Sequence, residues 1–156
     1  MDRECVTGLL TRYGDDVFRL AMSYLGNRQD AEDVCQNVFL SALNTKRVPL
    51  PGKEKAWLLT CTANACKNYL KSFWRRNVGE LDEAISFTDS TDQTLYDAVM
   101  KLSPKYRAVI HLYYYEGYDQ SEIGEILHLT RTAVQTRMSR AREMLKKELN
   151  DNEGAL

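Results

Sequence analysis

The side chains best suited to chemistry lie between residues 130 and 147, where short polar residues alternate with basic ones. An apolar stripe with steps of four, three and four residues marks this segment as an amphipathic helix: Val134, Met138, Ala141 and Leu145. Polar and cationic side chains face away from this stripe or flank it: Arg131, Thr132, Gln135, Thr136, Ser139 and Arg140. Hydroxyl and amide groups read base edges in a DNA groove, and arginines hold phosphates. The pattern therefore indicates hydrogen-bonding chemistry with duplex DNA.

A second, shorter helix must hold this segment in place. Ile123, Ile126 and Leu127 form its apolar stripe, and Thr130 is a suitable N-cap for the helix that follows. Two amphipathic helices joined by so few residues pack at a steep angle, which is the helix-turn-helix arrangement. Residues 130–147 contain six basic residues and one acidic residue, which suits either a solvated surface helix or a DNA-binding one. The turn, the cap and the charge together favour DNA binding.

The charge of the whole chain is segregated, although its net value is only −1. Residues 1–76 carry 12 basic and 8 acidic side chains, whereas residues 77–99 carry 6 acidic and no basic ones. Residues 100–156 carry 9 basic and 8 acidic side chains. A basic segment therefore stands on each side of an acidic connector, and the connector cancels the charge that would mark a nucleic-acid binder.

Catalysis and metal binding find no support in the sequence. No nucleophile–base pair or phosphate-binding loop is present, so we expect neither an enzyme nor a cofactor. The four cysteines form no CxxC pair, and only two histidines are available, so no metal site is expected: Cys5, Cys35, Cys61, Cys66, His111 and His128. No signal peptide or transmembrane run is present. We therefore expect no membrane insertion, a cytoplasmic location and reduced thiols.

The rest of the chain is predicted to be helical. Helices are expected at Cys5–Leu25, from the N-cap Asp30 to Leu43, and at Glu54–Arg76, with a proline-containing loop at 44–53. Further helices are expected from Thr94 and after Ser103-Pro104. The predicted fold is all-α, with two small helical domains joined by an acidic flexible linker. The predicted bounds are 1–76 and 95–150 for the domains, 77–94 for the linker and 151–156 for a tail.

Two helical faces have open interpretations at this level. The predicted buried side of helix 54–76 is largely aromatic and aliphatic: Trp57, Leu58, Cys61, Ala65, Tyr69, Leu70 and Phe73. Its aromatic residues suit stacking on unpaired bases or packing in a core, and packing is the preferred interpretation for Trp57, Tyr69 and Phe73. The exposed face of helix 30–43 includes Leu40, and this face is equally compatible with ordinary surface and with a docking site.

Three segments in this order resemble the extracytoplasmic-function (ECF) sigma factors of bacterial RNA polymerase: DAEDVCQNVFLSA, KAWLLTCTANACKNYLK and LSPKYRAVIHLYYYEGYDQSEIGEILHLTRTAVQTRMSRAREMLKKEL. The resemblance extends from about Thr7 to Leu149. It implies a sigma factor with a sigma-2 helical bundle and a sigma-4 helix-turn-helix domain, which binds core RNA polymerase and directs promoter recognition, strand opening and transcription initiation. A homodimeric helix-turn-helix regulator is the alternative, but it accounts only for residues 118–149.

The resemblance also implies partners and contact residues. Sigma-2 would dock on the clamp of the largest polymerase subunit through Asp33, Gln36, Asn37 and Leu40. Sigma-2 would also open the minus-ten element, with the loop 44–53 capturing a flipped base. Polar residues at the end of this loop and on helix 54–76 would contact the opened DNA: Lys53, Asn64, Lys67, Asn68 and Lys71. Sigma-4 would touch the flap of the second large subunit. It would read the minus-35 duplex through the polar and basic residues of the second helix of the helix-turn-helix: Arg131, Thr132, Gln135, Thr136, Ser139 and Arg140. Promoter DNA and an anti-sigma factor are the other expected partners.

Several positions depart from the family pattern. Asn37 and Asn68 stand where the family commonly has an acidic residue, and residues 61–62 replace the usual Ile-Ala pair. Gly124 replaces a common alanine, and His128 replaces a common glycine. We expect His128 to adopt a left-handed backbone conformation, because it occupies the position of that glycine.

Overall fold

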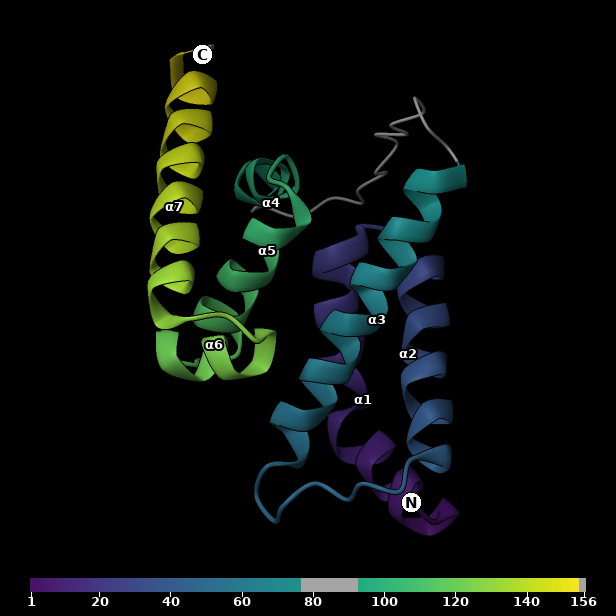
Figure 1. Ribbon diagram of the computed structural model, residues 1–156. Helices are drawn as coiled ribbons and strands as arrows, with labels where there is room; N and C mark the ends of the chain where they lie inside the picture. Colours follow the sequence, from purple (N-terminus) through teal and green to yellow (C-terminus); the bar gives the residue numbers. More distant parts are fainter. Residues whose placement is uncertain (77–92, 155–156) are drawn as a thin grey trace. The chain divides into compact units, whose positions relative to one another are not determined.

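The computed structural model describes residues 1–76 and 93–154, and these residues contain helices, turns and loops but no strand (Figure 1). The all-α prediction is confirmed. The chain forms two compact units, Met1–Glu83 and Ala84–Leu156. The predicted linker at 77–94 lies outside the described residues except for Gln93 and Thr94, which begin a helix.

The first unit is a bundle of α1 (Arg3–Leu25), α2 (Arg28–Asn44) and α3 (Glu54–Arg76), each packed against the other two (Figure 1). Helix α3 has the predicted bounds. The fully enclosed side chains of the core are mainly aliphatic: Leu9, Val17, Leu20, Ala21, Ala31, Leu58 and Leu59. The loop at 45–53 joins α2 to α3. Because both helices also pack against α1 and against each other, one core holds their exposed faces in fixed positions.

The junction between α1 and α2 corrects one prediction. Gly26 adopts a left-handed conformation with φ 67°, and its N–H donates to the Met22 carbonyl at 2.8 Å, which ends α1. Asn27 then caps α2, because its side-chain oxygen accepts a hydrogen bond from the Asp30 backbone N–H at 3.0 Å. The predicted cap at Asp30 is therefore wrong. Asp30 lies in the first turn, where its carboxylate complements the helix dipole.

The buried face of α3 also differs from the prediction. Besides Leu58, the residues it buries are Leu59, Thr62, Ala63 and Cys66. The predicted Trp57, Cys61, Ala65, Tyr69, Leu70 and Phe73 are only partly buried. Helix α3 contacts both α1 and α2, and the small side chains at 62, 63 and 66 suit a face packed against two helices at once. The Thr62 hydroxyl donates to the Leu58 carbonyl at 2.7 Å, so its burial leaves no unsatisfied donor.

The second unit contains α4 (Gln93–Met100), α5 (Pro104–Ile110), the π-helical turn η1 (His111–Tyr115), α6 (Gln120–Leu127) and α7 (Arg131–Gly154). Helix α7 packs against α4, α5 and α6. Ser103 is the N-cap residue of α5 and Pro104 occupies the first turn, as predicted, but the Ser103 side chain makes no capping hydrogen bond. Helix α7 continues to Gly154, so the first residues of the predicted tail are helical.

Helix α6 begins with a capping box, which stabilises the start of the helix-turn-helix. The Asp119 carboxylate accepts from the Glu122 backbone N–H at 2.9 Å, and the Glu122 carboxylate accepts from the Asp119 N–H at 3.0 Å. This reciprocal pair satisfies two backbone donors at the helix N-terminus. The sequence pattern Asp-x-x-Glu carries this signal, although the prediction did not include it.

The turn between α6 and α7 is closed by His128 and Gly124. His128 has φ 56° and ψ 46°, so the predicted left-handed conformation is confirmed. The Leu129 N–H donates to the Gly124 carbonyl at 2.8 Å, and a Cβ at residue 124 would lie only 2.6 Å from the Leu129 carbonyl oxygen. The lack of a side chain at Gly124 therefore allows the turn to close against α6.

Gly124→Ala is expected to lower the free energy of unfolding of the second unit by about 1–3 kcal/mol, because the backbone must shift to admit the methyl group. Gly8→Ala is the matched control, since a Cβ there meets nothing within 4 Å. It should stabilise the first unit by about 0.5–1 kcal/mol, because alanine favours the helix.

Urea unfolding followed by two probes separates these effects. Trp57 and Trp74 both belong to the first unit, so tryptophan fluorescence reports on that unit, whereas circular dichroism reports on both. Gly124→Ala should change only the circular dichroism transition. An unchanged circular dichroism transition would contradict the tight turn at residue 124.

Candidate nucleic-acid interface

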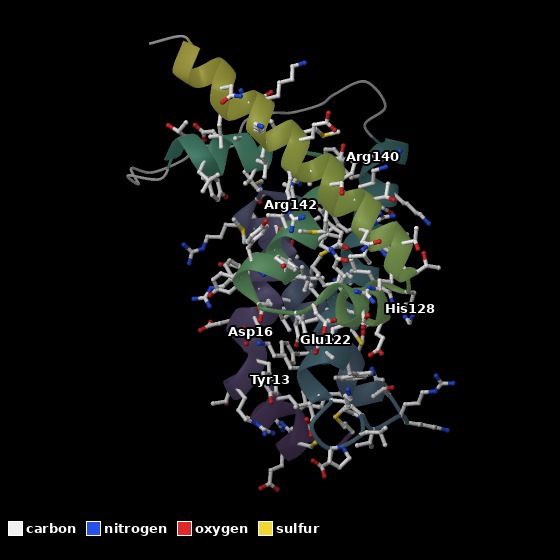
Figure 2. All side chains as sticks on the ribbon, turned by 90° about the vertical axis from the view of Figure 1, so that its left-hand side faces the viewer. Tyr13, Asp16, Glu122, His128, Arg140 and Arg142 are labelled. Carbon is white, nitrogen blue, oxygen red and sulfur yellow. The ribbon has the colours of Figure 1, made fainter. Side chains whose placement is uncertain are left out.

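The outer face of α7 gathers all six residues predicted to contact the minus-35 element. Val134, Met138 and Ala141 are each 0% exposed, which fixes the buried side of the helix. The six predicted residues are all exposed: Arg131, Thr132, Gln135, Thr136, Ser139 and Arg140. Arg140 projects from α7, and His128 marks the turn that precedes it (Figure 2). Helix α7 thus presents hydroxyl, amide and guanidinium groups to solvent on one face.

Local hydrogen bonds set what the start of α7 offers to a ligand. The Thr130 hydroxyl oxygen accepts from the Ala133 backbone N–H at 3.1 Å, so the predicted N-cap is confirmed. The Thr136 hydroxyl donates to the Thr132 carbonyl at 3.0 Å. Its hydrogen is therefore engaged within the helix, and Thr136 can accept a hydrogen bond from a base amino group.

The polar strip on α3 is largely accessible. Lys53, Asn64, Asn68 and Lys71 are exposed, and Lys67 is half-buried. The loop before α3 ends in a turn in which the Lys53 N–H donates to the Leu50 carbonyl at 2.9 Å, and Gly52 has φ 83°. This strip can supply cations for phosphates and amides for base edges.

Two apolar side chains of the loop are a feature that the sequence interpretation missed. Val48 is 69% exposed and Leu50 is 72% exposed. Large aliphatic groups in such positions contribute nothing to the core, and together they give the loop an apolar surface beside α3. Their occurrence among prolines in the sequence Val-Pro-Leu-Pro was the available signal.

The third candidate surface is the outer face of α2. Asp33, Gln36 and Asn37 are exposed, and Leu40 is 57% exposed. A groove of about 580 Å³ lies between α1 and α2, and Gln36 and Leu40 line it. The opposite wall includes Leu10, which is exposed, as is Leu43. Two helices in contact cannot bury every apolar position of broad stripes, and these two leucines fall outside the α1–α2 contact.

Three of the four cysteines, Cys35, Cys61 and Cys66, are at least partly buried in the first unit, whereas Cys5 is exposed. Burial raises the pKa of Cys66 to about 12 and raises the pKa values of Cys35 and Cys61 as well. Within residues 1–76 and 93–154, no group of three or more potential ligands could hold a metal ion. In the same part of the chain, no helix is long and apolar enough to cross a membrane.

Comparison with protein-family models assigns most of the chain. The model for Sigma-70 region 2 matches residues 9–76, and the model for Sigma-70, region 4 matches residues 92–145. These two matches correspond to the bundle of α1 to α3 and to the helices of the second unit.

Curated relatives and solved structures agree with the family models. The chain is 28% identical to the ECF RNA polymerase sigma factor SigW of Bacillus subtilis, over 96% of this chain and 91% of the relative. It is 30% identical to the ECF RNA polymerase sigma factor SigL of Mycobacterium tuberculosis, over 86% of this chain and 83% of the relative. The fold is similar to that of the sigma factor RpoE from Bartonella quintana, solved with the anti-sigma factor NepR, with a TM-score of 0.80, 22% identity and coverage of 92% and 96%.

A second solved structure, CnrH in complex with the cytosolic domain of CnrY, has a TM-score of 0.65 and 24% identity, and covers 96% of this chain and 90% of that one. The matches span both units, whereas a homodimeric helix-turn-helix regulator would account for the second alone. Sigma factors are transcription initiation factors and not enzymes. The chain belongs to the ECF family of RNA polymerase sigma factors.

Proposed function

We propose that this sigma factor divides its work among three exposed surfaces. The outer face of α2 docks on the clamp of the largest polymerase subunit. Helix α3 and the loop at 45–53 hold the opened minus-ten element, and α7 reads the minus-35 duplex while the second unit touches the flap of the other large subunit. The supporting observation is that the residues matched to these contacts are exposed or half-buried, whereas the apolar positions between them form the two cores.

The duplex-reading role of α7 rests on its rigidity and chemistry. A helix held by three fully buried residues can enter a major groove without losing its shape. Thr132, Gln135 and Ser139 offer short polar groups near its N-terminus, and Arg140 offers a cation further along. The short polar groups read base edges, and Arg140 holds a phosphate.

The strand-opening role of α3 rests on a different combination. Unstacking a base costs a few kcal/mol, so a surface that opens DNA must bind the extruded base or its backbone. The amides of Asn64 and Asn68 and the ammonium group of Lys71 are exposed along α3, and Lys53 is exposed where the loop at 45–53 meets this helix. They offer hydrogen bonds to the base and charge for the backbone.

We also propose an anti-sigma partner, in line with the complexes in which RpoE and CnrH were solved. Such a partner would compete with core polymerase for the exposed leucines of the first unit. The protein would act in the cytoplasm, where it meets RNA polymerase. Run-off transcription with purified core polymerase tests the function directly. Absence of promoter-dependent transcripts with every genomic promoter fragment would count against it.

Arg140→Ala should weaken binding of the minus-35 duplex across sequences, because a lost phosphate contact is insensitive to the base pair. It should also reduce the slope of log K against log salt by about 0.9. Holoenzyme binding to the duplex at several salt concentrations measures both.

Gln135→Ala and Thr132→Ala provide the contrast to this variant. Each should change which base is preferred at one position, by roughly 1–3 kcal/mol per base pair. Selection of preferred sequences from a randomised minus-35 duplex measures the effect. If all three variants select the same sequences as the wild type, α7 is not the recognition helix.

A further inference from the structure

Arg142 of α7, labelled in Figure 2, contacts two tyrosines of η1, the segment that precedes the helix-turn-helix. Its Nε donates a hydrogen bond to the Tyr114 hydroxyl oxygen at 2.9 Å. Its guanidinium carbon lies 5.4 Å from the centroid of the Tyr113 ring and 5.8 Å from that of Tyr114. The two rings meet edge to face with their centroids 4.9 Å apart. Tyr114 remains 60% exposed, so the contact faces solvent.

Helix α7 does not need this contact for its packing. Val134, Met138 and Ala141 are fully buried, and solvent-exposed contacts of a cation with an aromatic ring contribute little to stability. A long arginine side chain loses rotamer freedom when it binds a ligand, and a neighbour that orients it beforehand lowers this entropic cost. The contact is therefore better explained by orientation of the guanidinium than by attachment of the helix.

The position of Arg142 on α7 suggests what the guanidinium is oriented for. Arg142 follows Gln135 by seven residues and Ser139 by three, so the three exposed side chains share one flank of the helix. At 1.5 Å per residue, Arg142 stands about 10 Å beyond Gln135 along the axis. The major groove is about 12 Å wide. When Gln135 and Ser139 meet base edges, Arg142 therefore reaches the phosphate backbone at the border of the groove.

The hydrogen bond leaves the groups that a phosphate requires. It uses the Nε donor of Arg142, and the two terminal nitrogens keep four further N–H donors. We propose that Tyr114 is a positioning residue that holds Arg142 against one phosphate of the minus-35 duplex and acts on DNA only through Arg142. This inference rests on the proposed role of α7.

A scan of single phosphates tests the proposal with the holoenzyme. The probe is a minus-35 duplex in which one phosphate at a time is replaced by a neutral methylphosphonate. The wild type should lose affinity roughly tenfold at one position at the groove border. Arg142→Ala and Tyr114→Phe should both bind the unmodified duplex more weakly and should lose most of their sensitivity at that position. The double variant should bind no more weakly than Arg142→Ala.

Tyr115→Phe is the matched control, because Tyr115 is exposed but its ring stacks on His111 with centroids 5.0 Å apart. It should behave as the wild type. Wild-type affinity and phosphate profile for Tyr114→Phe, or additive effects in the double variant, would overturn the proposal. Weaker binding of core polymerase with unchanged DNA affinity would assign the tyrosines to a protein contact and would overturn it equally.

Failure of the proposed role of α7 has a different signature. In that case, the wild-type holoenzyme would not distinguish the minus-35 duplex from unrelated DNA. Normal selectivity of the wild type, with Tyr114→Phe unaffected, overturns only the assignment of Tyr114.

Discussion

Leu40→Asp should weaken binding to core RNA polymerase by about 2–4 kcal/mol, which is roughly thirty- to thousandfold. Leu40 is 57% exposed on α2 and lines the groove between α1 and α2. If it is buried in the clamp interface, the wild-type side chain contributes apolar area, whereas the variant places a desolvated carboxylate there. Competition of each variant with the labelled wild type for core polymerase measures the loss.

Val48→Asp is the matched control for this prediction. It introduces the same charge at an apolar side chain of the same unit that is even more exposed, at 69%, but lies in the loop after α2. It should retain core binding. The thermal unfolding of Leu40→Asp should stay close to that of the wild type, because the side chain projects into solvent. Wild-type core affinity for Leu40→Asp would remove the outer face of α2 from the clamp interface.

Asn64→Ala should reduce open-complex formation on a closed duplex promoter by roughly ten- to a hundredfold. Asn64 is exposed on α3 and offers an amide donor and a carbonyl acceptor, so it can read the edge of an unpaired base. Loss of such a base contact costs about 1–3 kcal/mol. Alanine preserves the helix and removes both groups. Permanganate reactivity of the minus-ten region measures the population of open DNA.

Two controls separate strand opening from other defects. A template with a pre-melted bubble should rescue most of the activity of Asn64→Ala if the residue assists melting. Gln29→Ala removes an exposed amide from the first turn of α2 and should leave permanganate reactivity unchanged. Core binding should be normal in both variants. Wild-type reactivity of Asn64→Ala would leave α3 as a scaffold with no role for this amide.

The sequence by itself determined the features that depend on residues close together in the chain. The steps of Val134, Met138 and Ala141 identified the buried side of α7, and hence its exposed face, because a helix of 3.6 residues per turn repeats locally. The cap at Thr130 was also predictable from neighbouring residues, and the left-handed His128 followed from its place at a position where the family commonly has glycine. Each depends on the backbone within one turn.

The tertiary structure alone decided features that depend on which helices meet. The buried face of α3 is centred on Leu59, Ala63 and Cys66 and not on the predicted residues. The reason is that α3 packs on two helices, and small side chains suit that contact. The tertiary structure also left Leu10 exposed in a groove. Periodicity shows that a helix has an apolar face, but the neighbours decide how much of that face is covered.

The contact between Tyr114 and Arg142 is the clearest case of a feature beyond local pattern. The two residues are 28 positions apart, and their meeting depends on how α5, which η1 follows, packs along α7. Likewise, Gly124 appears in the sequence as a weak position in a helix, and only the return of Leu129 toward α6 shows why a side chain does not fit there. Close approach between separate segments is set by packing of the whole unit, and no window of neighbouring residues contains that information.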